Sequence, residues 1–151
     1  MPDEIPQFIG EYEDVPVDPK GRLIVPLAIR KELPLGVNSF VVARWFDGCL
    51  AGFDPGVWHR VLQQLLALDG GQRQARQLRR SVAGGAMEAK IDRQGRLLIP
   101  RKLLDRANIM ERATVSGAID HVEIWNPARY VEYMNETDQR LEEIVETYGL
   151  R

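Results

Sequence analysis

The sequence predicts a mixed α+β fold made of a duplicated unit, because one phrase occurs twice in the chain. DPKGRLIVP at positions 18–26 recurs as DRQGRLLIP at positions 92–100, which is 74 positions further on. The likeness continues downstream, where FDP at 53–55 recurs as WNP at 125–127. Internal repetition fixes the architecture before any local propensity is weighed. We therefore expect two copies of one supersecondary unit.

Each unit shows the same order of elements: strand, loop, strand, short helix, hairpin and helix. In the first unit we expect strands at 8–17 and 23–25, a helix at 27–33, and hairpin strands at 40–46 and 49–53. The dipeptide Asp47-Gly48 between the hairpin strands is a strong turn signal. In the second unit we expect strands at 87–91, 97–99, 113–119 and 122–125. Pro26 and Pro100 each suit the first position of the short helix, where the missing N–H is not needed.

Three longer helices are expected, at 57–68, at 72–82 and from Pro127 onward, with Asp69-Gly-Gly71 separating the first two. The apolar face of the 57–68 helix is wider than one packing partner needs. Either a core covers this helix on two sides, or it contacts another subunit.

One unit has too few strands to bury a sheet face alone. Two units wrapped around a pseudo-twofold axis would close a small β-barrel and remove most sheet edges. This closed barrel with flanking helices is the predicted architecture.

The composition is that of an ordinary globular protein. The chain has 151 residues, of which 44% are hydrophobic and 28% are charged. No apolar stretch approaches the roughly 20 residues needed to span a bilayer. The acidic, proline-rich N-terminus does not resemble a signal peptide. The single cysteine, Cys49, excludes an internal disulfide and suits a reducing compartment, so we expect a cytoplasmic protein with no membrane partner.

The charges are distributed unevenly, although the net charge is only −2. Residues 1–14 hold five acidic and no basic side chains, whereas residues 73–106 hold ten basic and three acidic ones. Sixteen of the twenty basic residues are Arg, the side chain suited to phosphates and guanine edges. A solvated helix face with scattered ion pairs would give the same asymmetry.

The repeated D-x-x-x-R loop is the group of residues whose chemistry indicates a function. Asp18 and Arg22 in the first copy, like Asp92 and Arg96 in the second, flank a turn whose glycine (Gly21 or Gly95) lets the chain reverse. The aspartate can accept backbone N–H bonds or hold the guanidinium in one plane. A guanidinium held in this way is prepared to meet O6 and N7 of guanine. The alternative is an Asp–Arg pair that only fixes the turn.

Lys20 and Arg93 add one cation to each loop and are suited to phosphate contact. Arg76, Arg79 and Arg80, on the 72–82 helix, could add contacts to a nucleic-acid backbone. Ion pairs between subunits, formed with the acidic C-terminal helix, explain these three arginines equally well.

Other candidates for chemistry are weak. His59 and His121 have no Cys, Asp or Glu at metal-ligand spacing, and His121 aligns with the turn residue Gly48, so we expect it to be exposed. Cys49 is expected to be a small buried side chain. The sequence predicts no metal, no cofactor and no enzymatic activity.

Several signatures in the same order resemble the MraZ family. They are F-x-G-x-Y at 8–12, the paired D-x-x-G-R loops, FDGCL at 46–50, R-x-x-R-R at 76–80, and EIW at 123–125. The resemblance implies two tandem SpoVT-AbrB repeats at 8–58 and 86–130, connecting helices at 59–85 and a C-terminal helix at 131–151. It also implies an AbrB-like swapped-hairpin β-barrel.

The same resemblance implies a nucleoid-associated transcriptional regulator of the division and cell-wall gene cluster. Such a protein would bind double-stranded DNA at short G-rich direct repeats in its own promoter, as a ring-shaped homo-oligomer, often an octamer. The reading arginines would be Arg22 and Arg96, with Asp18 and Asp92 beside them. Two other hypotheses stay open: a ring-forming interaction protein whose loops bind protein or RNA, and an antitoxin-type AbrB protein. The second is disfavoured because two repeats fill the chain and leave no toxin-binding tail.

Overall fold

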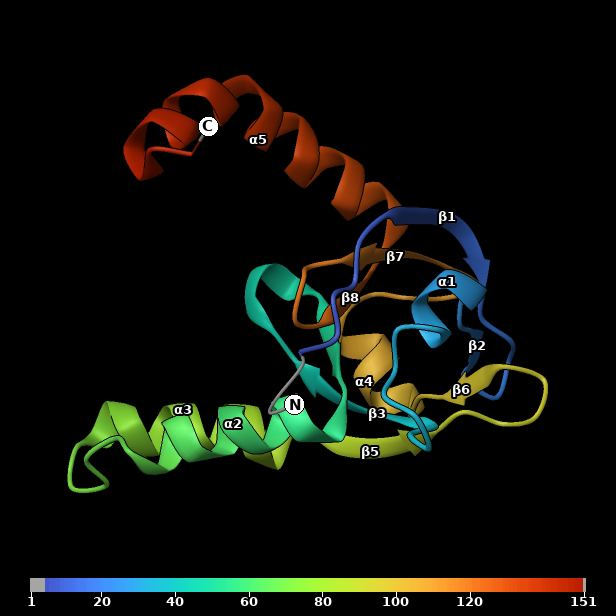
Figure 1. Cartoon of the computed structure of the whole chain (residues 1–151), viewed down its shortest axis with the longest axis horizontal. Helices are drawn as coiled ribbons and strands as arrows, with labels where there is room; N and C mark the ends of the chain where they lie inside the picture. The colour runs from blue at the N-terminus through green and yellow to red at the C-terminus, as the bar shows by residue number, and fades with distance from the viewer. Residues whose placement is uncertain (1–4, 151) are drawn as a thin grey trace.

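The computed structural model describes residues 5–150 and shows an α+β fold around an antiparallel sheet (Figure 1). Six strands follow the order β1-β7-β8-β4-β3-β5, and a separate ribbon pairs β2 with β6. The strands of the first half are β1 (Glu11–Pro16), β2 (Arg22–Ile24), β3 (Ser39–Arg44) and β4 (Leu50–Phe53). Those of the second half are β5 (Met87–Lys90), β6 (Arg96–Leu98), β7 (Arg112–Gly117) and β8 (Val122–Trp125).

The two halves exchange strands. The first strand of one half pairs with the hairpin of the other, so β1 lies against β7 and β5 lies against β3. Across the pseudo-twofold axis, β4 pairs with β8 and β2 pairs with β6. Neither half therefore has a complete sheet without the other.

The predicted closed, swapped-hairpin barrel is not confirmed. The edge strands β1 and β5 are not paired with each other within residues 5–150. Single bridges, Val17 to Leu23 and Ile91 to Leu97, join the edges to the β2–β6 ribbon. The ribbon is short because each strand lies between a loop glycine with positive φ, Gly21 or Gly95, and the proline, Pro26 or Pro100, that precedes the next helix. The result is an open sheet with a ribbon across its gap.

The core lies between the sheet and the ribbon and takes side chains from both halves. Its largest fully buried members are Phe8, Phe40, Leu23, Ile29, Leu50, Ile99, Leu104, Ile109, Ile124 and Val42, whereas Phe53 packs with Ala51 and Val57 in a second cluster. Leu23 and Leu97, from the buried face of the ribbon, join the first of these clusters. The burial of this shared core fixes the ribbon against the rest of the fold.

Two short helices and one 3₁₀ turn follow the strands. The helices α1 (Leu27–Arg30) and α4 (Arg101–Arg106) come directly after Pro26 and Pro100, which are the N-cap residues and not the first helical residues as predicted. The turn η1 (Phe46–Gly48) joins β3 to β4. Its residues Asp47 (φ 64°) and Gly48 (φ 83°) adopt a left-handed conformation. This conformation is typical of hairpin turns.

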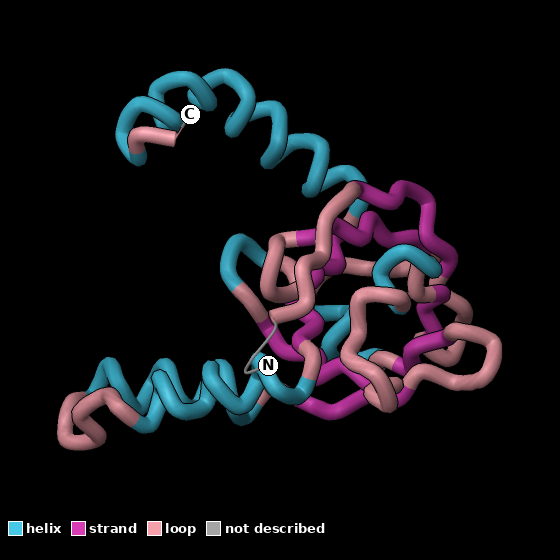
Figure 2. Tube along the Cα trace, in the orientation of Figure 1, coloured by secondary structure: helices cyan, strands magenta, loops and turns pink. Residues whose placement is uncertain are grey.

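The longer helices extend away from the sheet (Figure 2). They are α2 (Pro55–Leu66), α3 (Arg73–Gly84) and α5 (Pro127–Tyr148). Asp54 and Asn126 cap the N-termini of α2 and α5, each followed by proline at the first position. The start of α5 at Pro127 is as predicted, whereas α2 begins at Pro55, before the predicted position 57. No helix in residues 5–150 is long and apolar enough to cross a membrane.

The helices α2 and α3 run side by side as a hairpin that projects from one end of the molecule (Figure 1). The wide apolar face of α2 is only partly covered within one chain, because Leu66 remains 73% exposed. Both explanations of this face, a second core contact or a subunit contact, therefore remain predictions.

Candidate nucleic-acid interface

The first D-x-x-x-R loop is organised by one carboxylate. Oδ1 of Asp18 accepts hydrogen bonds from the backbone N–H groups of Lys20 and Arg22, both at 2.9 Å. Oδ2 of the same group accepts a bond from Nε of Arg22 at 2.5 Å. The aspartate thus fulfils both predicted roles, since it shapes the turn and also holds the guanidinium.

The second loop repeats this geometry. Oδ1 of Asp92 accepts from the backbone N–H groups of Gln94 and Arg96, both at 2.9 Å, and Oδ2 accepts from Nε of Arg96 at 2.9 Å. The hydrogen bonds that the backbone of Arg22 and Arg96 donates lower the pKa of Asp18 and Asp92, and the guanidinium groups add to this effect. Both carboxylates are therefore ionised at neutral pH, and the hydrogen bond between each carboxylate and its arginine is charge-assisted.

Glycine in each loop allows the two loops to interlock. Gly21 (φ 89°) and Gly95 (φ 80°) adopt left-handed backbone conformations. Such conformations favour glycine, which has no Cβ. The carbonyl of Gly21 accepts a hydrogen bond from the N–H of Ile99, and the carbonyl of Gly95 accepts one from Val25, both at 2.9 Å. Each loop is thus fixed by the strand that follows the other loop.

The β2–β6 ribbon brings the two arginines to one surface. Arg22 lies opposite Leu98 and Ile24 lies opposite Arg96 in the antiparallel register. Because side chains alternate between faces, Arg22 and Arg96 share the outer face. They are diagonal neighbours, with Cβ atoms somewhat less than about 7–8 Å apart by ordinary sheet geometry. Their side chains are 32% and 30% exposed, so this face is open to a ligand.

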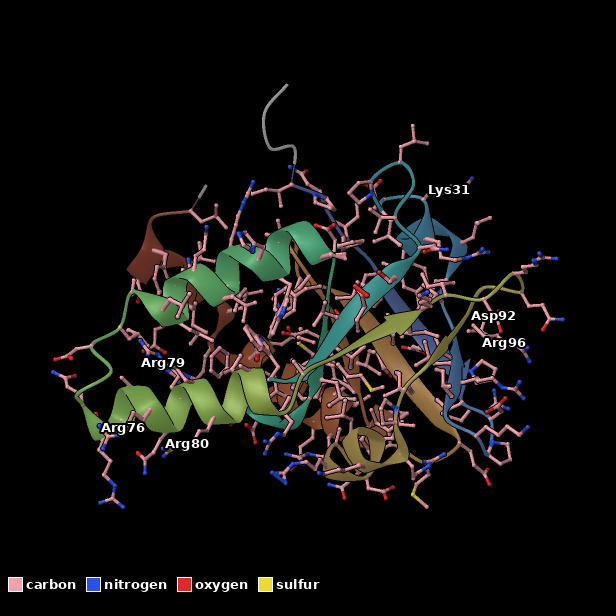
Figure 3. The ribbon with its side chains drawn as sticks, turned by 90° about the horizontal axis from the view of Figure 1, so that it is seen from below. Lys31, Arg76, Arg79, Arg80, Asp92 and Arg96 are labelled. Carbon is pink, nitrogen blue, oxygen red and sulfur yellow. The ribbon has the colours of Figure 1, made fainter. Side chains whose placement is uncertain are left out.

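Lys20 and Arg93 are exposed at the loop tips, beside the braced arginines. Arg76, Arg79 and Arg80 lie on α3, at the end of the molecule opposite Asp92 and Arg96 (Figure 3). Arg79 donates to the carbonyls of Leu65, Leu66 and Leu68, and Arg76 donates to those of Gly70 and Gly71. These two side chains hold the α2–α3 turn together, and within residues 5–150 neither forms an ion pair with the C-terminal helix of the same chain. Ion pairs with the C-terminal helix of another subunit stay a prediction.

Two further arginines, Arg101 and Arg30, lie against the loops, and the repeated phrase did not predict either contact. The guanidinium of Arg101, from α4, donates to the carbonyl of Asp18 at 3.4 Å. Arg30, from α1, packs over Gly95, where an added Cβ would lie 2.9 Å from its Cζ. Their counterparts in the other copy are Leu27 and Leu104, so comparing the copies could not find them. They raise the positive charge beside each loop.

His121 is not the exposed turn residue that the alignment with Gly48 predicts. Its side chain is 13% exposed, its ring stacks on Phe53, and its nitrogens contact Asp120 at 2.8 Å and Glu123 at 3.2 Å. Burial would lower the pKa of His121, but the bonds to these two carboxylates outweigh it and the pKa is raised.

The other candidate residues occupy ordinary positions. Cys49 is buried, as predicted, and burial raises the pKa of its thiol. His59 lies on α2, outside the loops and the ribbon. Residues 5–150 contain no group of three His, Cys, Asp or Glu side chains that could hold a metal ion.

Fold and site together define a duplicated α+β protein that presents two equivalent, carboxylate-braced arginines on one exposed β-ribbon. The family model described as "MraZ protein, putative antitoxin-like" matches this chain twice, over residues 8–81 and 82–151. The chain belongs to the MraZ family.

Similar proteins cover nearly the whole chain. A protein of Roseiflexus castenholzii named transcriptional regulator MraZ is 41% identical over 131 residues, which is 87% of this chain and 89% of that protein. A protein of the same name from Leuconostoc citreum is 40% identical over 139 residues, or 92% of this chain and 94% of the relative. A third, from Pediococcus pentosaceus, is 36% identical over 139 residues, with the same coverage.

Proposed function

We propose that this protein is a sequence-specific transcriptional regulator that binds double-stranded DNA through its paired D-x-x-x-R loops. Arg22 and Arg96 read guanines, Asp18 and Asp92 hold them in position, and Lys20 and Arg93 contact phosphates. The observation that carries this proposal is the identical bracing of two guanidinium groups on one exposed ribbon face.

The hydrogen bond to each aspartate leaves the terminal guanidinium nitrogens of Arg22 and Arg96 available to contact a base. Asp18 and Asp92 engage Nε, so the two terminal nitrogens are not used in the carboxylate bond. These nitrogens form the fork that pairs with O6 and N7 of guanine. A two-stranded antiparallel ribbon is also of a size that the major groove admits.

Phosphate contact supplies the part of the affinity that does not depend on sequence. Lys20 and Arg93 are exposed on the two loops, Arg101 contacts the first loop and Arg30 contacts the second, whereas the net charge of the whole chain is −2. Positive charge is thus concentrated at the ribbon. Arg76, Arg79 and Arg80 of α3 are candidates for additional contacts with the phosphate backbone of the DNA.

The finer features come from the likeness to the family. They are control of the division and cell-wall gene cluster, short G-rich direct repeats in the protein's own promoter, association with the nucleoid, and a ring-shaped homo-oligomer, often an octamer. The two AbrB-like repeats at 8–58 and 86–130, the connecting helices at 59–85 and the C-terminal helix at 131–151 belong to the same proposal. One protomer offers few cations, so several protomers on repeated boxes would gain affinity through effective concentration.

The test compares two classes of variant on the DNA upstream of this gene. Footprinting at two salt concentrations first defines the protected segment. The double variant Arg22→Ala/Arg96→Ala should then lose discrimination between this segment and unrelated duplex. Lys20→Ala/Arg93→Ala should weaken binding to both duplexes and lower the salt slope, with discrimination retained.

Arg140→Ala is the matched control, because Arg140 is an exposed arginine of α5 far along the chain from both loops. Each variant must keep the assembly state and thermal unfolding of the wild type. Unchanged discrimination by a folded Arg22→Ala/Arg96→Ala protein would refute the assigned roles. Binding of RNA or protein, but not duplex DNA, would favour the interaction protein instead.

A further inference from the structure

The outer face of the β2–β6 ribbon carries two exposed apolar side chains between its arginines. Ile24 is 46% exposed and Leu98 is 53% exposed. On the opposite face of the same ribbon, Leu23 and Leu97 are 1% and 2% exposed and belong to the core. Ile24 and Leu98 therefore contribute nothing to that core.

The register places these apolar groups beside the reading arginines. Leu98 lies directly across from Arg22, and Ile24 lies directly across from Arg96. Directly opposed side chains have Cβ atoms about 4.5–5.5 Å apart. The face is thus a square of alternating cationic and apolar side chains, with each kind on one diagonal.

The same position of the repeated phrase is apolar in both copies, although the side chains differ. Positions 24 and 98 correspond at the 74-residue offset that relates Arg22 to Arg96. A short solvated ribbon would ordinarily place polar residues on its outer face, since alternation separates the buried set from the solvated set. Two apolar side chains on this face indicate a partner that has apolar groups close to the groups that bind arginine.

The major groove of DNA has one strongly apolar feature, the C5 methyl group of thymine. Successive bases on a strand rise by about 3.4 Å, which is comparable with the spacing of opposed side chains on the ribbon. When Arg22 or Arg96 contacts a guanine, the apolar side chain directly across from it on the ribbon would lie over the adjacent base. A phosphate backbone or an RNA helix has no equivalent apolar group in a groove that such a ribbon can enter.

We propose that Ile24 and Leu98 are specificity-determining residues that contact thymine methyl groups next to the guanines read by Arg22 and Arg96. This inference rests on the proposed function, because it assigns a further part of the same interface. It adds thymines to the recognised sequence, at positions that arginine chemistry does not specify.

The experiment removes the methyl group from the DNA and the apolar side chain from the protein. Binding of the wild type to the footprinted duplex is measured by fluorescence anisotropy with thymine or with deoxyuridine throughout the protected segment. Loss of one buried methyl contact should weaken binding about fourfold, and loss of two correspondingly more. Because uracil pairs as thymine does, the guanine contacts are unchanged.

The variant Ile24→Ala/Leu98→Ala should bind the thymine duplex as weakly as the wild type binds the uracil duplex. It should then be insensitive to the replacement of thymine by uracil. Leu35→Ala is the matched control, since Leu35 is a fully exposed apolar residue in the loop before β3. This control should retain the sensitivity of the wild type.

The outcomes separate the two proposals. Equal binding of the wild type to thymine and uracil duplexes, or a protected segment without thymine, would overturn the inference and leave the DNA-binding proposal intact. Failure of the wild type to prefer the upstream duplex would refute the proposed function itself. A changed oligomeric state of Ile24→Ala/Leu98→Ala, with unchanged DNA binding, would identify the apolar pair as a protein contact and refute the inference.

Discussion

The two loop aspartates show how one short side chain determines both a turn and the direction of a neighbouring arginine. One oxygen of Asp18 binds two backbone N–H groups, and the other oxygen binds the guanidinium. Asn in this position could keep the turn, because its carbonyl oxygen still accepts hydrogen bonds. It would lose the charge-assisted bond that fixes the arginine.

His121 gives a prediction about pH at the residue scale. A raised pKa means that protonated His121 stabilises the fold, because Asp120 and Glu123 favour the charged ring. This contribution is complete below the unfolded pKa of about 6.5 and is lost as the pH rises through the folded-state pKa. The stability of the wild type should therefore fall as the pH rises above about 6.5 and through the folded-state pKa of His121.

His121→Gln should lack this fall, as measured by urea denaturation across the same range of pH. The control is His59→Gln, which removes the other histidine of the chain, a residue of α2. A wild type and a His121→Gln protein with parallel pH profiles would contradict the assignment.

At the scale of elements, the interlocked loops are equivalent in backbone but differ in what surrounds them. A Cβ added to Gly21 would lie 2.3 Å from the backbone oxygen of Ile99. A Cβ added to Gly95 would meet the flexible side chain of Arg30 at 2.9 Å. An arginine can move aside, whereas a carbonyl next to the β2–β6 ribbon cannot move without disturbing the ladder.

Gly21→Ala should consequently destabilise the protein more than Gly95→Ala. Each substitution costs roughly 1–3 kcal/mol for a non-glycine residue in a left-handed conformation. Gly21→Ala should cost more, because the displaced Ile99 also donates the hydrogen bond that holds the first loop. Urea denaturation midpoints at an unchanged m-value measure the difference, and equal midpoints would show that the two loops tolerate a Cβ alike.

At the scale of the whole molecule, the distribution of charge makes a prediction about DNA length. A protomer with net charge −2 and a few cations at one ribbon should bind a single box weakly. An assembly that engages several boxes at once can gain about 10²–10⁴ in affinity without any new contact.

Affinity should therefore rise steeply from one box to three boxes in tandem, and it should fall steeply with salt. Electrophoretic mobility shifts on duplexes with one, two and three copies of the protected box measure this dependence. A three-box duplex whose boxes are displaced by about half of the 10–10.5 bp turn is the control, because it places alternate boxes on the far side of the helix. Equal affinity for one box and for three would argue against assembly on the DNA.

Much of the local structure could be predicted from the sequence because it depends on neighbouring residues. The D-x-x-x-R turn needs only an aspartate, a glycine and an arginine within five positions. The β3–β4 turn follows from Asp47-Gly48, and the starts of α2 and α5 follow from their cap and proline residues. The buried position of Cys49 follows from its place among apolar residues.

The surroundings of His121 could not be predicted in this way. Alignment of the two copies placed it opposite a turn glycine, but Phe53 and Trp45, from the other copy, cover its ring. The closed barrel was also not confirmed, because the two edge strands meet the short ribbon through single bridges. In both cases the outcome depends on how the two copies pack together, which no local pattern contains.

The duplication and the pairing of one aspartate with one arginine in each copy could be found in the sequence alone, because they depend on residues close together in the chain. The packing of the two copies places both arginines on one face with Ile24 and Leu98 between them, and it places Arg30 and Arg101 against the loops of the other copy. The reason is that the antiparallel register of β2 and β6 joins two distant segments. A shift of one residue in that register would turn these side chains toward the core.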